Sequence, residues 1–289
     1  MVQVPEMWEP DNKLWTTAAR QSGIKIGEEA FPGNAEEKVH SKIATYIWIS
    51  KNCPDIPIPK LQGFGVPSGL SAFSGYIPQH RPVLLRYPYI LVDWIEHSDA
   101  QMRSNVFTMP HTEVQTRNLY RSISRIMISL AKFHSAELVP GRLITMDELA
   151  YPIVPYARGQ AKDLVLMQAL LHLFTDRHLH NSPFVMQLAD MHAINIFVDE
   201  DWNIKHVVDL EWACCLPLGN LLSPFWLNGQ SVDGLDGPEY EQFKACYEQF
   251  TTIFTTIFEQ EETDTPLHHK GSFYSCAKVM KGALYDGRY

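Results

Sequence analysis

The sequence lacks several features that would place it in a specialised class of protein. Its five cysteines form no CxxC pair, and a chain of 289 residues can bury a core without disulfide cross-links. No apolar run reaches the length of a membrane span, and the opening segment MVQVPEMWEPDNK has no signal-peptide pattern. The net charge of −9 argues against a general nucleic-acid binder, which needs a basic stripe. We therefore expect a globular, cytoplasmic protein with reduced thiols and with no membrane or nucleic-acid partner.

The most informative segment runs from Gln187 to Ala213. Two apolar, β-branched stretches, Ile194–Val198 and Ile204–Val208, flank a polar loop at 199–203, and this pattern predicts a β-hairpin. The loop contains Trp202, and we take this residue as the centre of the hairpin.

A hairpin that is symmetric about its centre would bring three polar side chains together. Asn195 and Asp209 would face one another across the two strands, and Asp190 would lie just ahead of the first strand. One amide and two carboxylates at one point can gather oxygen ligands for Mg²⁺ beside a group that orients an attacking hydroxyl.

These residues resemble the catalytic and metal loops of the kinase fold, in which an Asp is followed five positions later by Asn and a hairpin then ends in Asp. The text DxHxxNIxVDEDWNI, the following VDLEWA and the segment Pro217–Leu227 are similar to the aminoglycoside phosphotransferase / choline kinase-like family, above all to its fungal members. The resemblance extends from about Val39 into the C-terminal region, and it is strongest between Phe184 and Leu227.

The resemblance implies a role for each residue of the motif. Asp190 would be the catalytic base, Asn195 and Asp209 would hold Mg²⁺, and ATP would donate the phosphoryl group to a small-molecule hydroxyl. A different interpretation stays open, because Asp and Asn are common turn residues and an acidic hairpin is usually a solvated one. The chain would then be an unrelated α+β binding protein whose acidic cluster is structural.

The remaining patterns predict helices and strands on both sides of this segment. Helices are expected over Val39–Lys51, Leu119–His134, Gln160–Phe174 and Tyr240–Phe258, a strand from Leu61 onward, another over Tyr89–Glu96, and a surface loop over Pro67–Pro88. We expect Leu119–His134 to pack under the catalytic loop and Cys214 and Cys215 to be small buried packing residues.

The order of these elements fits a two-lobed, kinase-like α+β fold. Residues 1–96 would form a partial N-terminal lobe that clamps the nucleotide, and residues 97–289 a mainly helical lobe with the catalytic and metal loops. The resemblance implies that the strand after Tyr89 leads into a hinge, where backbone groups of Asp93 and Ile95 meet the adenine ring. A buried strand without this role would use the same residues.

The N-terminal lobe departs from the family pattern in its phosphate-binding parts. No glycine-rich turn between two strands precedes the first helix, and Gln3 stands where Arg or Lys is expected. Lys42 aligns with the Glu that would pair with that basic residue, although Glu36 or Glu37 could serve in another register. Leu188 replaces the usual His before the catalytic Asp.

These departures leave two functions open. Either the first strands of the lobe are missing from this sequence and the protein is an ATP- and Mg²⁺-dependent phosphotransferase, or the lobe has changed. In the second case the chain is a pseudokinase-like binding or scaffold protein. Phosphoryl transfer depends on positioning and charge neutralisation, so loss of the clamp would lower the rate by orders of magnitude.

Overall fold

The computed structural model describes the larger part of the chain. The described residues are 2–3, 34–66, 71–73, 87–95, 100–106, 110–133, 166, 169, 184–230, 234–264 and 270–285. The predicted lobe boundary near residues 96–98 lies outside them, and so does nearly all of the helix predicted over Gln160–Phe174.

The described elements are short antiparallel strands and longer helices. The helices are α2 (Asn34–Asn52), α3 (Arg103–Val106), α4 (Glu113–Ala131), α7 (Gly237–Asp264) and α8 (Lys270–Gly282), with 3₁₀ turns η2 (Ala193–Asn195), η3 (Leu210–Trp212) and η4 (Leu218–Asn220). The strands are β1 (Val2–Gln3), β2 (Leu61–Gly65), β3 (Ser71–Phe73), β4 (Tyr89–Val92), β5 (Gln101–Met102), β6 (Phe184–Leu188), β7 (Ile196–Val198), β8 (Ile204–Val207) and β9 (Ala213–Pro217).

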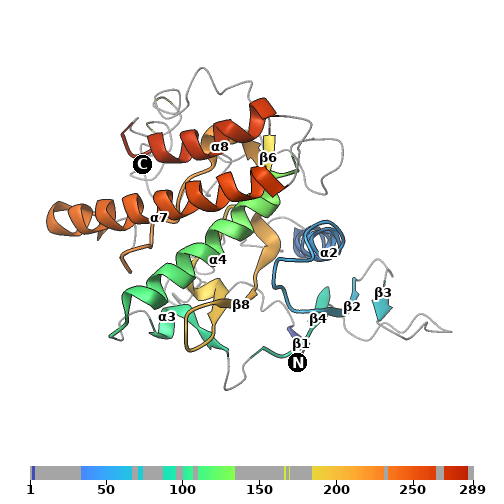
Figure 1. Ribbon diagram of the computed structural model, residues 1–289. Coiled ribbons are helices and arrows are strands. Elements are labelled where there is room, and N and C mark those ends of the chain that lie inside the picture. Colours follow the sequence, from blue (N-terminus) through green and yellow to red (C-terminus); the bar gives the residue numbers. More distant parts are fainter. Residues whose placement is uncertain are drawn as a thin grey trace.

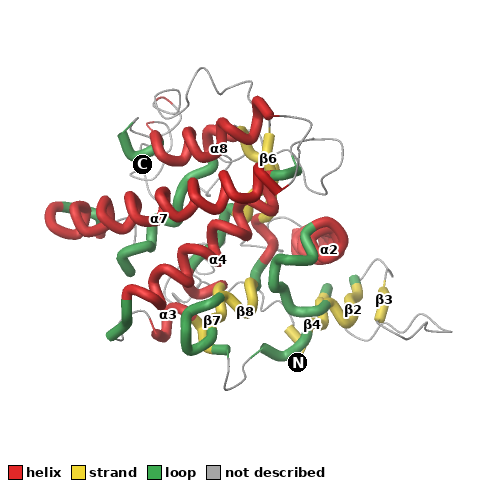
Figure 2. Tube along the Cα trace, viewed as in Figure 1, coloured by secondary structure: helices red, strands yellow, loops and turns green. Residues whose placement is uncertain are grey.

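The strands form three antiparallel sheets, ordered β1-β4-β2-β3, β5-β7-β8 and β6-β9. Figure 1 shows the four-stranded sheet at one end of the molecule and helices α4, α7 and α8 toward the other, with α2 between them. Figure 2 shows that β7 and β8 lie near α3 and that β6 lies near α8, away from the four-stranded sheet. The expected α+β class is confirmed for the described residues.

Helix α2 begins five residues before the predicted Val39 and ends one residue after Lys51. Its buried side chains, Val39, Ile43, Tyr46 and Ile49, recur at helical spacing and are at most 5% exposed. The helix contacts β2 and β4 of the four-stranded sheet and also the turn η3. It therefore connects the sheet to the segment that follows the hairpin.

Helix α4 begins at Glu113, six residues before the predicted Leu119, because a capping box starts it there. The Gln115 amide N–H donates to the Thr112 hydroxyl oxygen over 3.2 Å, and the Thr112 N–H donates to the Gln115 side-chain oxygen over 2.8 Å. The helix packs against α7 and contacts β6, and the Met186 N–H of β6 donates to the carbonyl of Phe133 just after the helix over 3.3 Å. The helix therefore supports β6, the strand that leads into the predicted catalytic loop, while its packing under the loop itself stays a prediction.

Helix α7 extends beyond the predicted Tyr240–Phe258 at both ends. Its aromatic side chains Phe243, Phe250 and Phe254 are fully buried, and the Phe250 ring meets Tyr120 of α4 edge-on, with 5.6 Å between the ring centroids. This contact is the centre of the helical core.

Two predicted boundaries in the four-stranded sheet are wrong. The loop expected over Pro67–Pro88 contains strand β3, which pairs with β2 through Gly63 and Phe73. Three residues are too few to show a periodic pattern, so this strand could not be predicted from apolar spacing. The strand expected over Tyr89–Glu96 ends at Val92.

Strands β6 and β9 close the segment that contains the hairpin. Five residue pairs join them, from Phe184 with Pro217 to Leu188 with Ala213, and the Ala189 N–H donates to the Trp212 carbonyl over 3.1 Å beyond the last pair. The segment 189–212 therefore begins and ends at neighbouring positions, beside the last pair of the β6–β9 ladder.

The cysteines agree with the prediction of reduced, buried thiols. All five are free, and Cys53, Cys214, Cys215 and Cys276 are buried. None of the described helices is long and apolar enough to cross a bilayer.

Candidate functional site

The tip of the β7–β8 hairpin is fixed by its own polar residues and by a buried ring. The Asp199 carboxylate accepts the backbone N–H groups of Asp201 and Asn203 over 3.1 and 2.9 Å. Trp202 has a positive φ of 62° and turns its ring inward, where it is 5% exposed. The Arg103 guanidinium lies 3.7 Å from the centre of this ring, and burial lowers the pKa of Arg103 to about 10. A tip held in this way fixes the register of both strands.

That register differs by one residue from the symmetric pairing. Ile196 pairs with Val207, and an irregularity between Phe197 and Val198 shifts the pairing toward the tip. The Val208 N–H donates to the Asn195 carbonyl over 2.9 Å, so Asn195 lies opposite Val208 and not opposite Asp209. The expectation that Asn195 and Asp209 face one another is wrong by one position, although both lie at the same end of the hairpin.

Asn195 joins the hairpin to the turn that carries Asp190. Its backbone N–H donates to the His192 carbonyl, and its side-chain Nδ2 donates to the Asp190 carbonyl, both over 3.0 Å. The residue is only 6% exposed. Because Nδ2 is held by the Asp190 carbonyl, Oδ1 is the amide atom that can bind a cation.

Asp190 lies in the turn after β6, and its carboxylate contacts His192. His192 Nε2 is 3.0 Å from Asp190 Oδ1, and the His192 ring meets Phe225 edge-on at 4.9 Å between centroids. The Trp226 indole N–H donates to the Met191 carbonyl over 2.8 Å. The segment after β9 therefore holds this turn from the other side.

Sequence reasoning assigned no role to His192, Phe225 or Trp226. The only signal was the place of His192 inside the DxHxxN motif and of the two aromatic residues inside Pro217–Leu227.

Asp209 has a backbone conformation that is uncommon for a residue other than glycine, with φ 57° and ψ 60°. It precedes η3, and its side chain makes no capping bond to that turn. The Lys42 ammonium of α2 contacts it instead, with Nζ 2.6 Å from Asp209 Oδ1. The Lys42 side chain is 17% exposed and that of Asp209 38%, so the pair lies at the edge of the core.

Tyr46, one turn further along α2, lies within reach of the same charge. Burial raises the pKa of Tyr46, and the negative charge of Asp209 raises it further. Sequence reasoning singled out Lys42 as a departure on α2, but nothing in the sequence indicated that it contacts Asp209.

The donor atoms of Asn195 and Asp209 fit a hard divalent cation in part. Mg²⁺ takes six oxygen ligands, and here one amide oxygen and one carboxylate are offered. In the described part of the chain no three His, Cys, Asp or Glu side chains gather at a possible metal site. Asn195 and Asp209 alone are too few to hold Mg²⁺, so other oxygen ligands would have to complete its coordination.

The two residues expected at the adenine hinge directly follow β4. The Asp93 N–H donates to the Lys60 carbonyl over 3.1 Å, and the Asp93 carboxylate accepts from Gln62 Nε2 over 2.6 Å. Strand β1 pairs with β4 through Val2 with Leu91 and Gln3 with Ile90. The backbone of Gln3 therefore lies beside β4, the strand that precedes Asp93 and Ile95.

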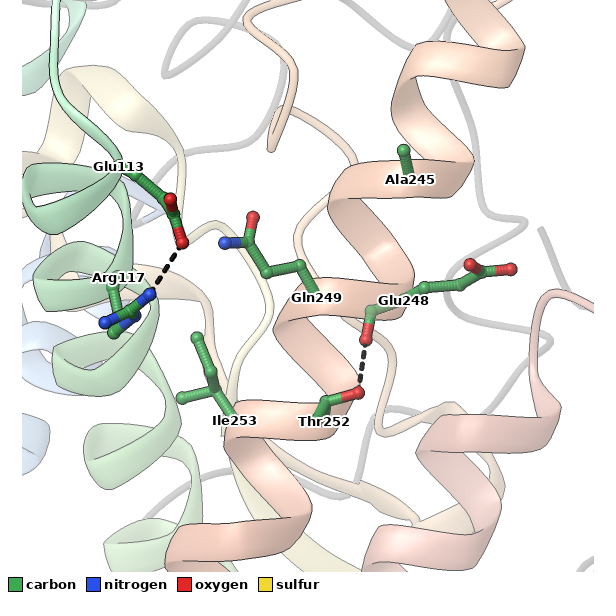
Figure 3. Close-up of a pocket in the computed structure, with 7 residues that line it drawn as sticks. All are labelled: Glu113, Arg117, Ala245, Glu248, Gln249, Thr252 and Ile253. Carbon is green, nitrogen blue, oxygen red and sulfur yellow. Dashed lines mark hydrogen bonds and ion pairs between the residues drawn. The ribbon is translucent and has the colours of Figure 1, made fainter.

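A groove of about 500 Å³ lies between α4 and α7, and Figure 3 shows its lining side chains. They are Glu113, Arg117, Ala245, Glu248, Gln249, Thr252 and Ile253. Glu113 and Arg117 form an exposed ion pair of 2.6 Å one turn apart. The lining contains none of the residues of the Asp190–Asp209 segment, so we assign the groove no role in that site.

Comparison with known proteins gave matches among solved structures alone. No family model matches the chain, and no curated protein matches it either. The GDP complex of wild-type aminoglycoside 2′-phosphotransferase-IIIa is similar at 10% identity and a TM-score of 0.44, over 86% of this chain and 83% of that one. A choline/ethanolamine kinase family protein from Mesorhizobium loti is similar at 14% identity and a TM-score of 0.38, over the same two shares.

Proposed function

We propose that this protein is a kinase-like phosphotransferase that uses ATP and Mg²⁺ to phosphorylate a hydroxyl of a small molecule. The observation that carries the proposal is the pair of bonds made by Asn195. Its side chain binds the turn of Asp190, and its carbonyl binds Val208, the residue before Asp209. Three residues with the types and order of a phosphoryl-transfer site are thus tied together by one short network.

Each residue of this network has a role in the proposed reaction. The Asp190 carboxylate is 33% exposed, so a substrate hydroxyl can approach it, and His192 holds its orientation. Asn195 Oδ1 and the Asp209 carboxylate would hold Mg²⁺, which neutralises charge on the transferred phosphoryl group when it is bound. Backbone groups of Asp93 and Ile95 would meet the adenine ring.

A second function, ligand binding without turnover, is favoured by one contact. Lys42 already neutralises the carboxylate that would hold the metal. The uncharged Gln3 supplies no cation on the strand side. Such a protein would bind a nucleotide or another metabolite on the same residues and signal through its conformation.

Thermal unfolding with Mg-ATP tests whether the site binds nucleotide. At a ligand concentration of about 100 times Kd, binding stabilises the folded protein by about 2.7 kcal/mol. That corresponds to a rise in Tm of roughly 5 to 10 °C for a chain of this size. Asp209→Asn should abolish the rise, whereas Asp201→Asn, the same change at the exposed hairpin tip, should preserve it.

Transfer of labelled γ-phosphate to a panel of small alcohols and aminoglycosides then separates the two functions. Phosphorylated product that disappears in Asp190→Ala supports the phosphotransferase. Stabilisation by Mg-ATP without any product supports binding without turnover. No stabilisation by ATP or GTP in the unaltered protein contradicts the phosphotransferase and leaves the second function only with a ligand other than a nucleotide.

A further inference from the structure

Two basic side chains contact the carboxylates of the candidate site, and they come from different parts of the chain. His192 lies in the same turn as Asp190, whereas Lys42 reaches Asp209 from helix α2, 167 residues earlier in the sequence. A polyphosphate that enters beside two carboxylates is repelled unless cations neutralise it. The structure therefore has to supply positive charge at this point if a nucleotide binds.

Lys42 is held firmly enough to serve as that charge. Its neighbours on the buried face of α2, Ile43 and Tyr46, are 5% and 3% exposed, and α2 contacts η3 directly after Asp209. The Lys42 side chain is largely shielded from solvent, so its interaction with an anion is screened less than at the surface. Its three N–H donors can bind a carboxylate and a phosphate oxygen together.

We propose that Lys42 is the phosphate-binding cation of this site, supplied by helix α2, and that Asp209 holds it in position when no ligand is bound. This inference rests on the proposed nucleotide site. The positive charge that the uncharged Gln3 cannot supply would then come from helix α2. Without ligand, the Lys42 ammonium is paired with Asp209. When the ligand binds, the ammonium also donates hydrogen bonds to phosphate oxygens.

The effect of the Asp209 charge on ATP affinity should depend on whether a divalent cation is present. Without a divalent cation, Asp209 both competes for Lys42 and repels the phosphates. Asp209→Asn should therefore increase the affinity for metal-free ATP. With Mg²⁺ present the carboxylate is needed, and the same substitution should reduce the affinity. Both changes follow from the charge of Asp209 alone, so the Lys42 variants decide whether the ammonium binds phosphate.

The test is a titration of the full chain with ATP, in excess EDTA and separately in excess Mg²⁺, with Kd measured by calorimetry. Lys42→Gln should weaken binding about tenfold or more in both conditions, since hydrogen bonds to charged groups contribute that much. Lys42→Arg keeps the charge and should restore most of the affinity. Lys51→Gln, at an exposed position in the last turn of the same helix, is the matched control and should change nothing.

The outcomes separate this inference from the proposed function. If Lys42→Gln binds ATP as tightly as the unaltered protein while Asp209→Asn loses Mg-ATP binding, the nucleotide site stands and Lys42 is only a counter-ion. Tighter binding of Mg-ATP by Lys42→Gln would show that the ammonium competes with the metal, which also overturns the inference. If the unaltered protein binds neither ATP nor GTP, the proposed function fails, and this inference fails with it. Circular dichroism of each variant verifies that it is folded.

Discussion

Replacement of Asn195 by alanine tests whether one buried amide holds the candidate site together. The substitution removes the Nδ2–H that donates to the Asp190 carbonyl over 3.0 Å, in a residue that is 6% exposed. The bond is partly buried, and an acceptor that loses its partner away from water costs about 1 to 3 kcal/mol. We expect the free energy of unfolding to fall by about 2 kcal/mol and Tm by roughly 4 to 8 °C in the ligand-free protein.

Asn118 provides a matched control for this experiment. Its Nδ2 also donates to a loop carbonyl over 3.0 Å, that of Asp201, but this bond is exposed to solvent. Water can replace an exposed bond, so Asn118→Ala should change the free energy of unfolding by less than about 0.5 kcal/mol. Denaturant titrations followed by circular dichroism measure both variants. Equal destabilisation by the two substitutions would refute the reasoning, because burial would then not decide the cost.

Three further predictions concern the core, a helix start and alkaline pH. Phe250→Ala should lower the free energy of unfolding by about 3 to 5 kcal/mol in denaturant titrations, because its buried ring joins α7 to α4. Thr112→Ala should cost about 0.5 to 2 kcal/mol in the same assay, because it removes half of the capping box. Stability should fall as pH rises from 9 toward 11, because burial raises the pKa of Cys53 and Cys214 from 9.0 to about 11 and the folded state then holds more protons than the unfolded state.

The chain itself offers controls for the helix start and for alkaline pH. Val114 in the first turn of α4 is 60% exposed, so Val114→Ala should leave stability within about 0.5 kcal/mol. A double variant, Cys53→Ala with Cys214→Ala, should flatten the loss of stability between pH 9 and 11. An unchanged slope would assign that loss to other groups, such as the buried tyrosines. An unaltered midpoint in Phe250→Ala would contradict the packing of α7 on α4.

Local sequence patterns were sufficient for the parts of the fold that are made by neighbouring residues. The spacing of apolar residues predicted the hairpin, helix α2 and helix α4. The start of α4 differs from the prediction because a capping box sets it. Thr112 with Gln115 is such a capping pair, and it starts α4 six residues before the apolar stripe becomes visible. Helices α2 and α4 were therefore predicted, with errors only at their ends.

The contacts that define the site were less accessible to sequence. The pairing of Asn195 with Val208 depends on an irregularity near Phe197 and on the left-handed conformation of Trp202. The spacing of apolar residues in the sequence indicates neither of them. The contact between Lys42 and Asp209 depends on where α2 packs, and packing between distant segments leaves no local pattern. The motif predicted the segment that carries Asp190, Asn195 and Asp209, but it did not indicate that Lys42 contacts Asp209.

The pairing of β6 with β9 has a consequence for how this site can persist. Every residue of the proposed catalytic and metal set lies within 189–212, and the ladder from Phe184–Pro217 to Leu188–Ala213 closes that segment on itself. Bonds within this segment, such as those of Asn195 to Asp190 and Val208, set part of its geometry, while Lys42 of α2 contacts Asp209 from outside it. A substitution that opens the β6–β9 ladder should therefore disturb Asp190, Asn195 and Asp209 together, even though it lies outside the segment that carries them.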